Sequence, residues 1–411
     1  MGQVLACRSR QRHLSDLAEI VYRKEVPVPR LQRRFCLREH RARPPARARR
    51  LAFGVSLLSL AFAAACGASP DAESPADEAV EGGTEGSAQT TGDAASIATH
   101  AVGLSYHTVG SALASLISNH SDISATVVAT AGPNAWMPDL EAGNVDFGLL
   151  SVVDVGWSME GGPGYENPAE HLRTVAQGAA LHGSGLTVRA DSGIERIEDL
   201  AGRRVASDYG GNVISARFVE LGLESVGVGW DNVDAVPVAD VSTGIDALRN
   251  GQVDAISGAA PTSPNLLDAH VATPVRILPV GNHTPADIAD GVPSETQEMI
   301  DRLIPGATLA TQPAGTGMLE EETVLIQHRV QLVSSDHVTA DTVYAALDAL
   351  WENYEEMHDA HPLAQWVPED MVPSAPRAPY HEGAVQFYED QGVWTDEHQQ
   401  AQEELQTATA G

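Results

Sequence analysis

Polar side chains that follow two short apolar runs are the residues of this sequence whose types and spacing could do chemistry. Asn134 follows the run Val127–Thr130 across a Gly-Pro turn, and Ser151 and Asp154 follow the run Val145–Leu150. In an open α/β sheet, the carboxyl ends of neighbouring strands border the crevice that binds ligands. These side chains therefore predict a crevice that holds a small polar solute. The alternative is that Asn134 and Asp154 only cap the helices that follow them.

A second group with the same arrangement occurs later in the chain. A strand predicted at Arg204–Ala206 is followed by a Ser-Asp-Tyr-Gly-Gly-Asn turn, and a helix begins near Asn212. The first N–H groups of a helix and the positive end of its dipole suit a carboxylate. A glycine turn before a helix is common, so this signal alone is weak. The binding residues predicted from this second half are Ser207, Tyr209, Gly210, Asn212 and Gly258.

Three aromatic side chains lie close to these turns. Tyr106 begins an amphipathic helix that extends to Leu116, Trp136 lies in the helix after Asn134, and Tyr209 lies in the second turn. Each could contact a solute, and each could equally pack against a sheet, which is the usual position of a large ring. Tyr106 and Trp136 join the predicted binding residues, with both alternatives open.

The elements that must position these residues alternate between strands and helices, which predicts an α/β protein. The sequence Leu-Glu-Ala-Gly-Asn-Val-Asp-Phe at 140–147 has an echo, Leu-Arg-Asn-Gly-Gln-Val-Asp-Ala, at 248–255. Two α/β lobes that each contain the same unit of a helix, a glycine turn and a strand explain this repeated sequence. We expect residues 96–190 and 276–411 to form the first lobe and residues 191–275 the second, with crossings near Ala190 and Arg276.

The N-terminal segment has the features of an export signal. Basic residues at 41–50 precede an apolar run, Leu51–Ala65, and small residues precede Cys66. The apolar run is shorter than the ~20 residues of a membrane span. We expect residues 1–65 to be a signal segment and Cys66 to be a lipid anchor. A start codon assigned too early would explain why residues 1–40 are longer than a signal requires. Ordinary cleavage that leaves Cys66 as a free thiol is the alternative. Residues 66–95 are small and acidic, which predicts a disordered tether.

The charge of the chain excludes some classes of partner. Residues 1–50 hold fourteen Lys and Arg against four Asp and Glu, so removal of this +10 from the total of −31 leaves −41 for the remainder. Lys24 is the only lysine. Phosphates would be repelled by such a body, which argues against nucleic acid and anionic membrane surfaces as partners.

Several motifs occur in the order seen in one family of receptors. The chain resembles the TAXI-type solute receptors of TRAP transporters, which have the type II periplasmic binding protein fold. The resemblance covers about residues 96–395 and rests on these motifs: YHTVGSALA at 106–114, GPNAW at 132–136, GNVDFG at 143–148, VRADSG at 188–193, DLAGRRV at 199–205, GQVDA at 251–255, His361-Pro362, HEGA at 381–384 and Phe387-Tyr388. Members of that family usually carry a Gly/Ser-rich turn where this chain has Thr99–Val102.

The resemblance implies a two-lobed α/β fold, with a mixed sheet flanked by helices in each lobe and strands that cross between them. It also implies a monomeric extracytoplasmic receptor that captures a small organic acid or amino acid, glutamate-like among them, and delivers it to a TRAP-type permease. No cofactor and no metal are expected. Only eleven arginines follow residue 50, so neutral donors near Tyr106, Asn134, Ser151, Ser207 and Gly210–Asn212 would hold a carboxylate.

Two other classes of protein remain as alternatives. A sensor that signals to a membrane kinase would have the same sequence features, and the same fold can host an enzyme. The sequence contains no Gly-x-Ser-x-Gly, His-Glu-x-x-His or Walker motif, so we expect a protein without catalytic activity. His358 and His361 have the spacing of a metal pair on a helix, but Pro362 ends that helix, which favours a surface pair.

Overall fold

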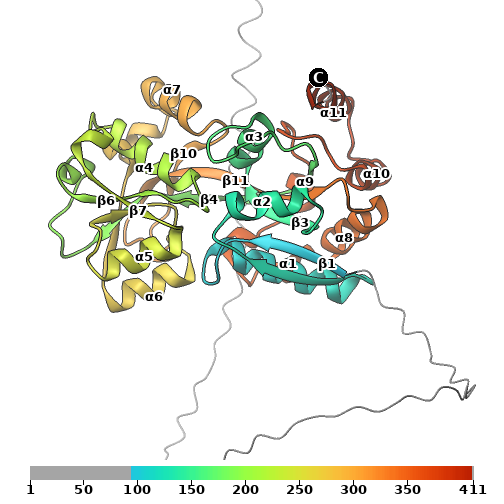
Figure 1. The fold of residues 1–411 in the computed structure, drawn as a ribbon, viewed down its shortest axis with the longest axis horizontal. Coiled ribbons are helices and arrows are strands. Elements are labelled where there is room, and N and C mark those ends of the chain that lie inside the picture. The colour runs from blue at the N-terminus through green and yellow to red at the C-terminus, as the bar shows by residue number, and fades with distance from the viewer. Residues whose placement is uncertain (1–93, 410–411) are drawn as a thin grey trace, which may run out of the picture. The chain divides into compact units, whose positions relative to one another are not determined.

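The computed structural model describes residues 94–409, which lie within one compact unit, Glu85–Gly411. Two mixed sheets, each flanked by helices, form two lobes in this unit (Figure 1). The predicted fold class, a two-lobed α/β protein whose lobes are joined by crossing strands, is confirmed. The predicted signal segment, the lipid anchor at Cys66 and most of the predicted tether lie outside the described residues.

The sheet of the first lobe has the strand order β2-β1-β3-β11-β10, and β4 pairs with β11 as well. Strands β1, β2 and β3 are parallel, while β11 is antiparallel to β3. The bounds are β1 (Ala94–Thr99), β2 (Ser124–Ala129), β3 (Phe147–Ser151), β4 (Leu172–Ser184), β10 (Thr308–Gln312) and β11 (Thr323–Ser335). The last two residues of the predicted tether, Ala94 and Ala95, therefore belong to β1.

The second sheet repeats this order as β7-β6-β8-β5-β9. Strand β6 is parallel to β7 and β8, and β5 is antiparallel to β8 and β9. The bounds are β5 (Leu186–Arg189), β6 (Arg204–Asp208), β7 (Asp234–Val238), β8 (Ala255–Ile256) and β9 (Val275–Leu278). The parallel strands of both lobes come from the repeated strand–helix units that the sequence predicts.

Helices cover both sheets, and most begin after a strand of the same lobe (Figure 1). The first lobe contains α1 (Ser105–His120), α2 (Pro133–Glu141), α3 (Val152–Glu160), α8 (Ala340–Asn353), α9 (Pro368–Met371), α10 (Glu382–Asp390) and α11 (Asp396–Thr409). The second contains α4 (Ile214–Glu224), α5 (Val241–Arg249) and α6 (Pro264–Ala272), and α7 (Ser294–Leu303) contacts α4. Among residues 94–409, no helix has both the length and the hydropathy that a membrane span requires.

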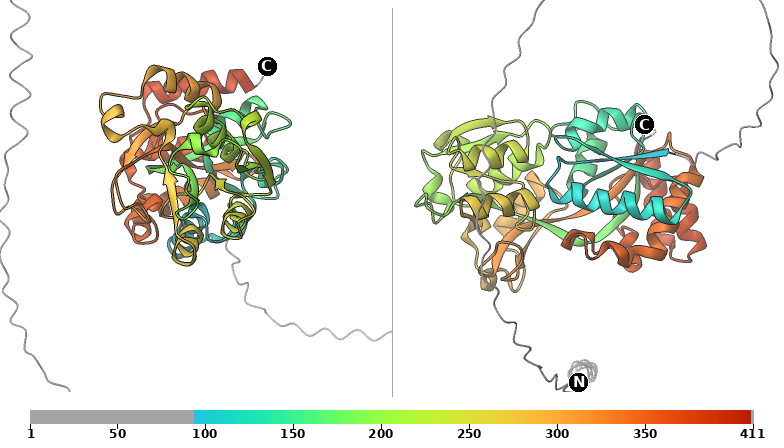
Figure 2. Two further views of the ribbon diagram at one scale, coloured as in Figure 1. Left: turned by 90° about the vertical axis from the view of Figure 1, so that its left-hand side faces the viewer. Right: turned by 90° about the horizontal axis from the view of Figure 1, so that it is seen from below.

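Two long antiparallel strands, β4 and β11, connect the lobes (Figure 2). The lobe boundaries were predicted near Ala190 and Arg276, whereas the strand pairing puts the ends of the second sheet a few residues away from both. Strands β5 and β9 pair with each other in the second sheet, so neither belongs to the first lobe as predicted. An apolar strand has the same sequence pattern in either sheet, and only the pairing reveals that the outward crossing lies at Gly185.

One acidic residue explains the repeated Asn-Val-Asp and Gln-Val-Asp sequences. In the first lobe, a carboxylate oxygen of Asp146 accepts the backbone N–H of Ser96 in β1 at 2.8 Å. In the second lobe, Asp254 accepts the N–H of Arg204 in β6 at 3.0 Å. Each Asp therefore ties the start of one parallel strand, β3 or β8, to the parallel strand beside it, β1 or β6, which fixes the register of the parallel strands.

Candidate solute site between the lobes

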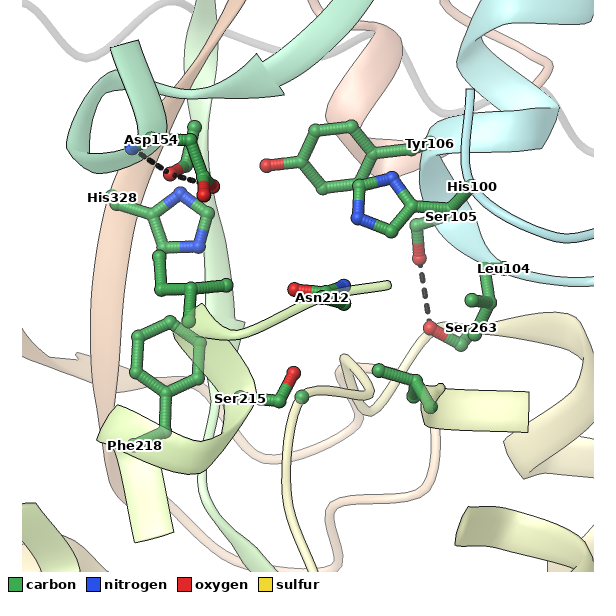
Figure 3. Close-up of a pocket in the computed structure, with 14 residues that line it drawn as sticks. His100, Leu104, Ser105, Tyr106, Asp154, Asn212, Ser215, Phe218, Ser263 and His328 are labelled. Carbon is green, nitrogen blue, oxygen red and sulfur yellow. Dashed lines mark hydrogen bonds between the residues drawn. The ribbon is translucent and has the colours of Figure 1, made fainter. Parts of the chain in front are cut away.

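A buried cavity of about 20 Å³ lies where the two lobes meet (Figure 3). Five residues that the sequence predicts as binding residues line it, and nine others line it as well. The predicted ones are Tyr106, Ser151, Asp154, Asn212 and Gly258. The others are His100, Leu104, Ser105, Ile214, Ser215, Phe218, Val241, Ser263 and His328. None of the fourteen is Arg or Lys.

The first turns of four helices contribute lining residues. Leu104, Ser105 and Tyr106 come from the start of α1, and Ser151 and Asp154 come from the start of α3. The start of α4 supplies Asn212, Ile214 and Ser215, and the start of α5 supplies Val241. Each helix carries about half a positive elementary charge at its N-terminus. These helix starts favour an anionic group near them although the cavity wall has no basic side chain, whereas Asp154 opposes one on its own side.

Three polar atoms in the cavity wall are buried without a hydrogen-bond partner: His100 Nδ1, Asn212 Oδ1 and Ser215 Oγ. Buried polar atoms are paired in nearly all native structures, so unpaired ones need an explanation. These three come from both lobes and border the same small space. A bound polar molecule would pair with all three, and this is the property expected of a ligand site without its ligand.

Gly258 provides the space in which the hydroxyl of Ser215 lies. A Cβ on Gly258 would lie 2.1 Å from Ser215 Oγ, and the backbone of Gly258 has a φ of +98°, which favours glycine. The sequence predicts Gly258 as a binding residue, and in the structure its contribution is the absence of a side chain beside Ser215.

Asp154 is the acidic residue of the cavity, and it is buried. Its carboxylate accepts hydrogen bonds from the Ser151 hydroxyl at 2.6 Å and from the Tyr165 hydroxyl at 3.0 Å. Burial raises the pKa of Asp154 to about 6, although the hydrogen bonds from Ser151 and Tyr165 lower it. Ser151 caps α3 by accepting the N–H of Asp154, so the capping alternative does not hold as stated: the cap of α3 is Ser151 and not Asp154, and the residue at the cap of α2 is Gly132 and not Asn134.

Two histidines face the same space as neutral rings. Burial lowers the pKa of His100 to about 3, and the nearby His328 lowers it further. Burial lowers the pKa of His328 to about 4, against the opposite effect of the Arg329 carbonyl. The ring of His100 packs on Tyr106 with centroids 4.3 Å apart, and that of His328 stacks on Phe218 at 5.7 Å. Neutral imidazoles offer hydrogen bonds to a solute without a fixed charge.

Trp136 and Tyr209, two aromatic residues predicted to bind, lie in the core and not in the cavity wall. Trp136 is fully buried and covers Gly148 of β3, where a Cβ would lie 2.3 Å from the ring. Tyr209 is also fully buried, and its hydroxyl accepts the N–H of Ser257 at 2.9 Å. Both rings therefore pack in the core, which was the alternative to contact with a solute. Each fills a gap that a glycine or a turn leaves beside a sheet.

Asn134 lies outside the cavity wall and forms one hydrogen bond to the second lobe and one within the first lobe. Its side-chain oxygen accepts the N–H of Val213, just before α4, at 2.9 Å, and its amide donates to the Gly164 carbonyl at 3.0 Å. Ser207 is buried near the end of β6, and its carbonyl accepts the N–H of Tyr209. Gly210 is exposed, with open space where a side chain would be. Neither Ser207 nor Gly210 lines the cavity.

The remaining wall residues were missed because distant segments bring them together. Ser105 and Ser263 belong to different lobes, and their hydroxyls lie 2.9 Å apart. His328 lies in the middle of β11, where its sequence neighbours are those of an ordinary core strand. His100 had a signal: it stands in the segment Thr99–Val102, where the chain departs from the Gly/Ser-rich turn of the family it resembles.

The size of the cavity limits what it can contain in this conformation. A volume of about 20 Å³ is little more than the 10–15 Å³ that one water molecule requires. A solute with several heavy atoms therefore enters only when the lobes or the lining side chains move apart. The conformation seen is a closed one.

Comparison with known proteins identifies the family. The model of the NMT1-like family matches residues 97–392, whereas no curated protein sequence matches the chain. Similar solved structures include the alkanesulfonate-binding protein SsuA of Xanthomonas axonopodis pv. citri bound to MOPS, which is 14% identical over 74% of this chain and 95% of that chain, with a TM-score of 0.40.

Two further similar structures are also binding proteins. The periplasmic aliphatic sulphonate binding protein SsuA of Escherichia coli is 16% identical over 75% of this chain and 91% of that chain, with a TM-score of 0.38. The substrate binding protein of an amino acid ABC transporter is 11% identical over 65% of this chain and 95% of that chain, with a TM-score of 0.39. The TAXI subtype stays a prediction from the motifs. Because the family model matches most of its length, the chain belongs to the NMT1-like family.

Proposed function

We propose that this protein is an extracytoplasmic receptor that captures a small amino acid or organic acid, glutamate-like in chemistry, between its two lobes. The observation that carries the proposal is the set of unpaired polar atoms, His100 Nδ1, Asn212 Oδ1 and Ser215 Oγ, in one buried cavity between the lobes. A monomer would bind the solute without a cofactor. The lipid anchor at Cys66 would keep it at the membrane.

The four helix starts favour an acidic group on the solute. A carboxylate would lie near the starts of α1 and α4, where the hydroxyl of Ser215 can donate to it. This arrangement needs no arginine, in agreement with the small number of basic residues in the chain.

Asp154 favours an amino acid over a simple organic acid. A buried carboxylate repels a second carboxylate when it is ionised, but it attracts an ammonium group. Since the pKa of Asp154 is about 6, its side chain is ionised at neutral pH. A solute with an ammonium group beside its carboxylate complements both parts of the wall.

Delivery to a TRAP-type permease is the part of the proposal that rests on the motif resemblance. Closure of the lobes on the solute would present one combined surface to the membrane partner. The solute can populate the closed form only as far as it binds that form more tightly than the open one.

The first test is the thermal stability of the purified full-length protein in the presence of solutes. Glutamate and 2-oxoglutarate form an informative pair, because they differ only in the ammonium group that Asp154 would bind. A ligand at a hundred times its dissociation constant should stabilise the protein by about 2.7 kcal/mol. We expect stabilisation by amino acids and a smaller effect from the matching keto acids.

The same measurement with substituted proteins locates the site. Ser215→Ala and Asn212→Ala each remove one unpaired atom, and each should weaken binding by about tenfold, the value of one hydrogen bond. Ser115→Ala is the matched control, since its hydroxyl lies on the exposed part of α1 and bonds only to the Ser111 carbonyl. If both cavity variants bound every solute like the wild type, the cavity would not be the binding site.

A further inference from the structure

A second group of side chains with binding chemistry lies in the first lobe and does not line the cavity. It consists of His171, Asp336 and His337, which offer one ligand atom each, all within 4.8 Å of one another. His171 precedes β4, and Asp336 and His337 follow β11. The sequence contains no sign of this group, because His171 and Asp336 are 165 residues apart.

The backbone holds the two segments together firmly. Leu172 and Ser335 are paired residues of the β4–β11 ladder, and the N–H of Asp336 donates to the carbonyl of His171 at 2.9 Å. The three side chains therefore project from a rigid ladder end rather than from a long loop. A site on such a support loses little side-chain freedom when it binds an ion.

The spacing of the side chains is that of a metal site before the ion arrives. Nδ1 of His171 lies 2.8 Å from Oδ1 of Asp336, and the rings of His171 and His337 have centroids 4.2 Å apart. Ligand atoms about 2.1 Å from a tetrahedral zinc ion are roughly 3.4 Å from one another. Small side-chain rotations are enough to move three atoms within 4.8 Å to that spacing.

The surrounding hydrogen bonds orient the ligands as in known metal sites. Nε2 of His337 lies 3.2 Å from the carbonyl oxygen of Glu141, and a metal-binding histidine usually donates its other N–H to such an acceptor. The proton on Nε2 leaves the lone pair on Nδ1. The carboxylate of Glu141 also accepts the N–H of His171 at 3.0 Å, which fixes the position of the other histidine.

Arg173 and Glu141 lie beside the group, and their opposite charges offset each other. The guanidinium of Arg173 pairs with Oδ2 of Asp336, and this leaves Oδ1 toward His171. The carboxylate of Glu141 lies on the other side, bonded to the N–H groups of Glu170 and His171. The cation that Arg173 contributes is thus offset by Glu141, and the carboxylate of Asp336 remains as the net negative charge at the site.

We propose that His171, Asp336 and His337 bind a divalent transition-metal ion such as Zn²⁺. Two imidazole nitrogens and one carboxylate oxygen suit zinc, and three protein ligands leave a fourth position for water. The ion links the start of β4 to the end of β11. The competing explanation is an ordinary Arg–Asp–His ion-pair network that binds no metal.

Competition for Zn²⁺ against a chromophoric chelator, with the full-length protein, distinguishes the two. We expect His171→Gln and His337→Gln to lose one bound equivalent, or to bind it at least ~10-fold more weakly than the wild type. The control is His120→Gln, because His120 is also paired with a carboxylate, Glu356, at 3.1 Å but lies in no group of three ligands among the described residues. Zinc that binds to cysteines or to other histidines is the same in every variant, so it cancels when the variants are compared.

Zn²⁺ should also raise the melting temperature of the wild type and of His120→Gln, but not that of the two cluster variants. The metal-free melting temperatures show whether each variant is folded, and His337→Gln disturbs least, since the ring of His337 forms its hydrogen bond with a single backbone carbonyl. If the cluster variants keep the same zinc equivalent and the same zinc-induced shift as the control, the proposal is wrong. The solute site shares no residue with this group, so the two proposals can fail separately.

Discussion

The carboxyl group of Asp154 is a residue-level feature with a consequence for stability. It is buried between the starts of two helices and is bonded to Ser151 and Tyr165. Its pKa is about 6 in the folded protein against 3.8 as the ordinary value. The folded state therefore holds this proton more tightly than the unfolded chain, and ionisation of the group at higher pH destabilises the fold.

The sign of this effect gives a prediction for Asp154→Asn. As the pH rises from about 4 to about 6, the wild type should lose stability relative to the variant, by about 3 kcal/mol in total. Above about pH 7 the difference should stay constant, because the carboxyl group is then ionised in both states. Urea unfolding of both proteins at several pH values measures it, and subtraction cancels the titration of every other group. A stability difference that does not change between pH 4 and pH 7 would mean that Asp154 has an ordinary pKa.

Much of the residue-level site could be expected from strand ends, but its chemistry could not. Ser151, Asp154 and Asn212 line the cavity because they follow predicted strands. His100 and His328 could not be recognised as its neutral rings, because their low pKa values come from burial by segments of both lobes. Whether an aromatic ring such as Trp136 lies in a cleft or a core depends on its neighbour across the sheet, here Gly148.

At the scale of elements, the strand–turn–helix unit that was predicted from Val127 to Leu150 is present as β2, α2 and β3. Trp136 fixes α2 to this sheet, because its ring occupies the space above Gly148. The repeated acidic residues Asp146 and Asp254 explain why the echo in the sequence corresponds to a repeated sheet order. The exact crossing points could not be read from the sequence, since strand pairing over long distances leaves no local pattern.

Removal of the Trp136 ring should therefore damage the fold. Trp136→Ala should lower the free energy of unfolding by about 3–5 kcal/mol, the usual cost of a large core cavity, as measured by urea unfolding. Trp136→Phe should retain most of the stability. Val271→Ala is the surface control, since Val271 is 86% exposed and should change stability by less than about 0.5 kcal/mol. A Trp136→Ala protein of normal stability that binds no solute would instead place the ring at the ligand.

At the scale of the whole molecule, the closed conformation depends on a contact between turns of the two lobes. The turn before α2 touches the turn before α4: a Cβ on Gly211 would lie 2.3 Å from the Cβ of Ala131, and one on Gly132 would lie 2.4 Å from the Gly211 carbonyl. The hydrogen bond from Val213 to Asn134 lies beside this contact. No side chain fits between the lobes there.

Gly211→Ala should consequently favour the open form. The apparent dissociation constant for a solute rises in inverse proportion to the closed fraction, and the radius of gyration from small-angle scattering should increase. Gly210→Ala is the matched control, because Gly210 is the neighbour of Gly211 in the chain and a Cβ on it would lie in open space. Equal affinity and equal radius for the two variants would mean that the turns do not limit closure.

The contact at Gly132 and Gly211 also bears on how the protein can evolve. Because the backbones of Gly132 and Gly211 meet there, the contact itself uses no side chain of the cavity wall. On the proposed function, a few substitutions in the cavity wall, at positions such as Asp154 and Ser215, would change the solute that binds while the contact between the two turns stays as it is.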